Sequence, residues 1–113
     1  RRGRREGHPS GAGRAGGGCG GAFVSLFLGA LADGAGTCGL PRDKARRYAA
    51  QRVLGTAQLA RQSGQHTATM KDAGCSPGGT TIAGVRALER GGFRSAAMEA
   101  VIAAYEKTLA LKS

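Results

Sequence analysis

Residues Cys75–Phe93, CSPGGTTIAGVRALERGGF, contain one complete helix signal with its beginning and its end. Apolar residues recur at the spacing of a helix face: Ile82, Val85 and Leu88. Pro77 and two glycines precede this pattern, and a second pair of glycines interrupts it. The stretch therefore predicts a helix from Thr80 to Arg90 that begins directly after a tight turn.

The turn before this helix has two interpretations. Pro77 fixes its own φ, and the two glycines after it let neighbouring N–H groups point the same way at a helix N-terminus. Such a loop can bind a carboxylate or phosphate without a charged side chain. Alternatively, the side chain of Ser76 or Thr80 caps the helix, and nothing binds. Residue chemistry alone favours neither.

The rest of the chain is also predicted to be helical. The other expected helices are Ala22–Ala35, Pro41 to about Gln62, a short piece at Ala68–Ala73, and Arg94–Leu111. No segment has the convincing alternation of a β-strand. We therefore expect an all-α fold, a compact domain of about five helices.

Small residues form the apolar stripe of the second helix: Ala45, Ala49, Val53, Ala57 and Ala60. The chain has no Trp and only 4% aromatic residues. A core of alanine buries little area per residue, so its contribution to stability is small. Docking against a partner subunit is expected to supply the rest.

Residues 1–20 are expected to form a disordered leader, and residues 21–113 the helical domain. The leader contains GAGRAG (Gly11–Gly16), which matches the GxGxxG fingerprint of dinucleotide-binding loops. That fingerprint is meaningful only between a buried strand and a helix, and the preceding RREGHPS cannot be a core strand. We therefore expect no cofactor-binding residues here.

Charge and cysteine content narrow the possible partners. The formal net charge is +10, but the basic residues outside the leader are scattered among few aromatics, which favours a solvated surface over a nucleic-acid site. Three widely spaced cysteines favour a reducing cytoplasm and support no metal site. The longest apolar run, Ala22–Leu28, is too short to span a bilayer. His66 is isolated and is expected to be a capping or solvated residue rather than a base.

Several segments resemble pyrroline-5-carboxylate reductase, specifically its C-terminal helical dimerisation domain. They are ALADGAGTCGLPRDKARRYAAQ, VLGTAQLARQSGQH, KDAGCSPGGTTIAGVRALERGGFRSAAMEAV and the helical tail. The resemblance is close from about Gly18 to Lys112, and S-P-G-G-T-T-I-A-G is its most specific part. The leader aligns without gaps as a degraded start of the same domain.

This resemblance implies reduction of 1-pyrroline-5-carboxylate to L-proline with NADPH or NADH, the last step of proline biosynthesis. It implies a homodimer or larger homo-oligomer joined through the helices. The backbone amides of Ser76, Gly79 and Thr80 would hold the substrate carboxylate, and the Thr81 hydroxyl would hydrogen-bond the ring nitrogen as the catalytic group. The family's N-terminal Rossmann domain is not among these 113 residues. The chain alone is therefore expected to bind no cofactor and to be inactive.

Some positions depart from the family pattern. Gly29 replaces an expected Glu, Gly36 and Gly74 replace aliphatic residues, and Arg52 and Arg61 occupy sites that are usually small or apolar. These changes are expected to weaken the domain, since a glycine inside a helix costs about 1 kcal/mol. Two other interpretations remain open: a non-catalytic helical self-association module, and a basic RNA-binding peptide.

Overall fold

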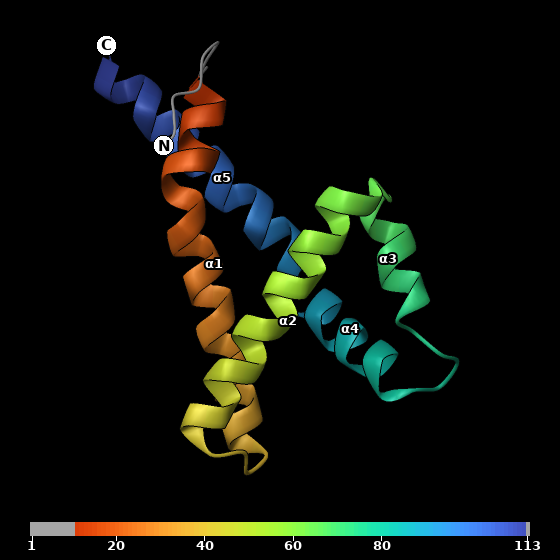
Figure 1. Cartoon of the computed structure of the whole chain (residues 1–113). Coiled ribbons are helices and arrows are strands. Elements are labelled where there is room, and N and C mark those ends of the chain that lie inside the picture. Colours follow the sequence, from red (N-terminus) through yellow and green to blue (C-terminus); the bar gives the residue numbers. More distant parts are fainter. Residues whose placement is uncertain (1–10, 113) are drawn as a thin grey trace. The chain divides into compact units, whose positions relative to one another are not determined.

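In the computed structural model, residues 11–112 are described, and all of their regular structure is helical. The helices of this part are α1 (Gly11–Thr37), α2 (Arg42–Ser63), α3 (Thr67–Ala73), α4 (Thr80–Arg90) and α5 (Phe93–Lys112) (Figure 1). The predicted all-α fold is confirmed. The observed ends of α2 to α5 differ from the expected ones by no more than one residue.

The first helix begins earlier than the sequence predicted. α1 starts at Gly11, whereas the expected helix started at Ala22. The prediction of a disordered leader is therefore wrong for residues 11–20, and residues 1–10 lie outside the described part. Once the apolar segment from Ala22 on has formed a helix, each further residue adds a hydrogen bond without a new nucleus. The GxGxxG match at Gly11–Gly16 is thus the first turns of a helix, not a loop after a strand.

α1 also contains a segment that is long enough to cross a membrane. Its segment Cys19–Thr37 is 19 residues long with a mean hydropathy of 1.4, which is long and apolar enough to cross a bilayer. This segment is longer than the uninterrupted apolar run Ala22–Leu28, because the alanines and glycines after Leu28 add few polar side chains to the following turns. The core helix of a soluble protein and an N-terminal signal sequence can meet the same two criteria.

A tight turn joins α1 to α2. Gly39 has φ of 104°, a left-handed conformation that favours glycine. The N–H of Leu40 donates to the Ala35 carbonyl at 3.0 Å, which closes the last turn of α1. Pro41 stands at the N-cap of α2, and the guanidinium of Arg42 pairs with the Asp33 carboxylate across the turn.

The helices fall into two compact units. One comprises Leu26–Gly91, and the other combines the chain up to Ser25 with the chain from Gly92 on. The buried core of the first unit consists of small residues from α1 and α2: Ala32, Ala45 and Ala49, with Leu28 and Ala35 packed against them. The start of the predicted alanine stripe is therefore confirmed as the helix–helix contact.

Large apolar side chains remain outside this core. In Leu26–Gly91, Leu54 is 59% exposed, Leu59 50% and Tyr48 55%. Several apolar residues of α5 are also exposed in the second unit: Met98, Val101, Ile102 and Leu109. Exposed apolar area on this scale is typical of a surface that binds another protein.

The glycines inside α1 provide a test of the predicted weakening. A Cβ added at Gly29 or Gly36 would meet nothing within 4 Å, and neither backbone lies in the left-handed region. Gly29→Ala and Gly36→Ala should each raise the free energy of unfolding by about 0.5–1 kcal/mol, because alanine loses less backbone entropy in a helix. Urea unfolding followed by circular dichroism measures the change. Gly39→Ala is the matched control and should destabilise, and equal effects at all three positions would contradict this account.

Candidate functional site

The loop between α3 and α4 is built by backbone hydrogen bonds. The N–H of Gly74 donates to the Lys71 carbonyl at 3.1 Å, and that of Cys75 to the Asp72 carbonyl at 3.0 Å, which ends α3. Gly78 has φ of 68°, and the N–H of Gly79 donates to the Ser76 carbonyl at 3.0 Å. The chain therefore reverses within Ser76–Gly79 and enters α4 immediately.

The N-terminus of α4 has no side-chain cap. Gly79 is the N-cap residue, with φ of −82° and ψ of 176°, and it has no side-chain oxygen to offer. Neither Ser76 nor Thr80 caps the helix, so the capping alternative does not describe this structure. Among the described residues, no hydrogen bond is recorded for the N–H of Ser76 or Thr80, and both residues are exposed. These groups, together with the helix dipole, are available to an anion.

Gly79 is needed for the close approach of Ser76. A Cβ at position 79 would lie 2.4 Å from the Ser76 hydroxyl oxygen and 3.3 Å from the Ser76 carbonyl oxygen. The structure thus brings Ser76, Gly79, Thr80 and Thr81 together in one short loop and helix start, as predicted. It differs in one respect, because the N–H of Gly79 is already used inside the turn.

A groove of about 590 Å³ extends from this helix start across Leu26–Gly91. Its lining comes from four helices: Leu31, Ala35, Tyr48, Ala49, Arg52, Thr56, Met70, Lys71, Gly74 and Thr81. Two of these residues are cations, and Lys71 pairs with the neighbouring Asp72 at 2.7 Å. Thr81, the predicted catalytic residue, therefore lines a groove that is mostly apolar and also carries hydroxyl groups and two cationic side chains.

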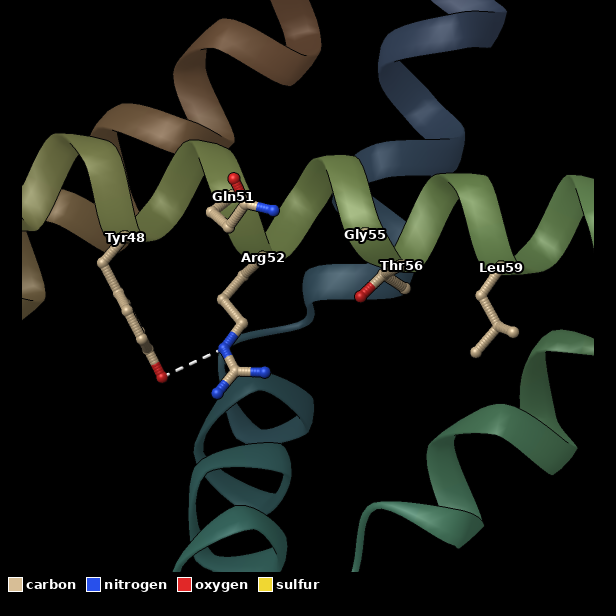
Figure 2. Close-up of a pocket in the computed structure, with 6 residues that line it drawn as sticks. All are labelled: Tyr48, Gln51, Arg52, Gly55, Thr56 and Leu59. Carbon is tan, nitrogen blue, oxygen red and sulfur yellow. Dashed lines mark hydrogen bonds between the residues drawn. The ribbon is translucent and has the colours of Figure 1, made fainter.

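The second cation of the groove is held by an aromatic ring. The guanidinium carbon of Arg52 lies 5.1 Å from the centre of the Tyr48 ring, and Arg52 Nε donates to the Tyr48 hydroxyl at 3.1 Å. Figure 2 shows both side chains leaving the same side of α2 as Thr56 and Leu59. Sequence reasoning missed this pair, although a spacing of four residues in a predicted helix could have indicated it.

His66 has a structural role. It is the N-cap residue of α3, and its Nδ1 accepts a hydrogen bond from the Ala68 N–H at 3.1 Å. The expected capping role of His66 is therefore confirmed. In the described part of the chain, no three His, Cys, Asp or Glu residues are grouped to hold a metal ion. All three cysteines are free thiols.

The described residues do not form a loop that fits a nucleotide cofactor. The GxGxxG match is helical, and residues 11–112 contain no strand to direct it at a pyrophosphate. The available groups are those of the loop: outward N–H donors, two threonine hydroxyls and the adjoining groove. This arrangement can hold a small carboxylate.

Comparison with known proteins identifies the family. The model for pyrroline-5-carboxylate reductase dimerisation matches residues 11–111. The chain belongs to this family. Residues 11–20 are part of the match, in agreement with their helical structure and with the gap-free alignment of this segment to the start of the domain.

Relatives from distant organisms carry the same helices. Pyrroline-5-carboxylate reductase of Synechocystis sp. is 55% identical over 91 residues, which are 80% of this chain and 34% of that protein. The Escherichia coli enzyme is 47% identical over 87 residues, 77% of this chain and 32% of the enzyme. The chain thus spans about a third of the length of these reductases.

A solved structure of the family has the same fold. The crystal structure of Plasmodium falciparum pyrroline carboxylate reductase with NADP bound superposes with a TM-score of 0.87 at 36% identity, covering 91% of this chain and 42% of that one. The family is one of oxidoreductases, and this relative binds a pyridine nucleotide. The matched region of the family is its dimerisation domain, which implies association of identical chains.

The cap of α3 can be tested in this family domain. His66→Ala removes the acceptor for the Ala68 N–H and should lower the free energy of unfolding by about 1 kcal/mol. His66→Asn keeps a side-chain acceptor at the N-cap and should lose much less. Thermal unfolding of both variants measures the difference. Equal losses would show that the contact contributes nothing to stability.

Proposed function

We propose that this chain is the substrate-loop and dimerisation portion of a pyrroline-5-carboxylate reductase. In this proposal it anchors 1-pyrroline-5-carboxylate while NADPH or NADH, bound outside these 113 residues, supplies the hydride that gives L-proline. The chain alone then has no reductase activity. The observation that carries the proposal is the uncapped start of α4, which lies inside the region matched by the family model.

The loop would hold the carboxylate of the substrate. The N–H groups of Ser76 and Thr80 are free to donate, and a carboxylate placed between them would also interact favourably with the N-terminus of α4. Gly79 would join them by sharing its N–H between the Ser76 carbonyl and the substrate. Such charge-assisted hydrogen bonds are stronger than neutral ones, which favours an anionic substrate.

Thr81 would act on the ring nitrogen. Its hydroxyl lies one residue beyond the carboxylate-binding amides and faces the groove. A five-membered ring held by its carboxylate would bring its imine nitrogen within reach of that hydroxyl. A hydrogen bond to the nitrogen polarises the C=N bond and makes its carbon a better hydride acceptor. Thr81 is therefore the proposed catalytic residue of this half of the site.

The partner proposed for the exposed apolar surface is a second copy of the chain. Three buried alanines leave side chains such as Leu54, Leu59 and Ile102 exposed, and a family dimerisation domain would cover them in the homo-oligomer. The same contact would cover α1, so we propose neither a membrane nor a nucleic acid as partner. Three free thiols support a reducing location, and we propose the cytoplasm.

Ligand binding tests the substrate loop. Proline at millimolar concentration should shift the amide NMR signals of Ser76, Gly79 and Thr80 in the folded dimer, because its carboxylate accepts from these N–H groups. Pyrrolidine is the matched control ligand, since it has the same ring without a carboxylate, and it should shift none of them. Unchanged signals with both ligands would rule out carboxylate binding and favour a non-catalytic self-association module.

Self-association is tested separately. Light scattering coupled to size exclusion should give at least twice the mass of one chain, 11.4 kDa, over the concentration range in which the chain is folded. On dilution, the loss of helix signal should accompany dissociation, since the alanine core of a single chain is small. A folded monomer that persists at all concentrations would contradict the proposed partner.

A further inference from the structure

We propose that Arg52 gives the groove lined by Thr81 a second anion-binding group, so that the site binds small dicarboxylates more tightly than monocarboxylates. This inference rests on the proposed carboxylate loop and adds a residue that discriminates among its ligands. The proposed substrate, 1-pyrroline-5-carboxylate, has a single carboxylate and leaves Arg52 unused. A small dicarboxylate would therefore compete with it for the same groove.

The charged side chains that line the groove are all positive. The lining contains two cations, Arg52 and Lys71, and no Asp or Glu among its described residues. Lys71 is paired with Asp72 at 2.7 Å, so its charge is partly compensated. Arg52 forms no ion pair with any residue in the described part of the chain. An anion that enters the groove is therefore attracted chiefly by Arg52.

Tyr48 holds the guanidinium and leaves its outer end available. The guanidinium carbon lies 5.1 Å from the centre of the Tyr48 ring, and Arg52 Nε donates to the Tyr48 hydroxyl at 3.1 Å. Figure 2 shows the guanidinium extending away from α2, with Nε turned toward that hydroxyl. The terminal nitrogens of an arginine fit the two oxygens of a carboxylate. A side chain that is already held in place loses less conformational entropy on binding.

The groove has room for a ligand longer than one ring. Its volume of about 590 Å³ lies in the range of pockets that bind drug-sized molecules, so a five-membered ring with one carboxylate leaves much of it empty. Thr81 directly follows Thr80, whose N–H is one of the proposed carboxylate donors, whereas Arg52 lines the groove from α2. Two carboxylates on one ligand would thus each find charge-assisted donors, and apolar lining such as Leu31 would contact the carbon chain between them.

The experiment compares dissociation constants by NMR titration of the full chain at neutral pH. The ligand pairs are succinate with butyrate, glutarate with valerate and adipate with hexanoate, which match in carbon number. At constant ionic strength, at least one dicarboxylate should bind about fivefold more tightly than its matched monocarboxylate, which corresponds to about 1 kcal/mol. That dicarboxylate should shift the Arg52 side-chain Nε–H signal and the amide signals of Ser76 and Thr80 with a single dissociation constant.

Two variants separate Arg52 from the general positive charge of the chain. Arg52→Gln removes the charge and keeps a long polar side chain, so the preference for that dicarboxylate should fall to about twofold or less. Arg47→Gln is the matched control, with the same change on the same helix at a residue that does not line the groove, and it should keep the wild-type preference. Glutamine is a good helix former, so both variants should keep the wild-type helix content. An equal loss in both variants would overturn the role assigned to Arg52.

The outcomes distinguish this inference from the proposed function. A folded wild-type chain whose Ser76 and Thr80 signals respond to no carboxylate refutes the carboxylate loop and therefore both. Equal binding within every matched pair refutes only the inference. A preference that persists unchanged in Arg52→Gln also refutes only the inference, since the second carboxylate then binds elsewhere. Different dissociation constants at the loop and at Arg52 refute it too, because the two groups would then bind separate ligand molecules.

Discussion

The packing of alanine against alanine is the contact on which the described structure depends. Ala32 of α1 meets Ala45 and Ala49 of α2, and these are the buried apolar residues of the described chain. Small side chains let two helices approach closely, but they remove little apolar area from water. A close contact between α1 and α2 and an extensive exposed apolar surface therefore have the same cause. The exposed surface leads to the proposed second copy.

The proposed substrate loop depends on the absence of a side chain at one position. With Gly79 at the N-cap, no side-chain oxygen occupies the start of α4, and Ser76 can approach within a distance that a Cβ would prevent. A helix N-terminus that is not capped from within the protein can interact with an anion from outside it.

The residues that depart from the family pattern lie in different parts of the structure. Gly29 and Gly36 weaken α1 from within, and nothing in the neighbouring structure requires a glycine at either position. Gly74 has φ of −89°, and a Cβ there would make only ordinary contacts, so its backbone does not require glycine either. Arg52 instead changes the surface, since it places a charge in an otherwise mostly apolar groove. The three glycines lie in or next to helices, whereas Arg52 lies on the lining of the groove.

The sequence by itself determined the helices, the turns and the loop, because these depend on residues close together in the chain. The helical spacing of Ile82, Val85 and Leu88, the glycine at position 39 and the Pro-Gly-Gly turn each act locally. The start of α1 differs from the predicted one, since extension of a helix into a glycine-rich segment depends on the helix that has already formed next to it. Only the tertiary structure showed which side chains α1 to α4 bring to one groove, and that both Arg52 and Thr81 line it. Those neighbours are set by packing between distant segments, which residue spacing alone does not define.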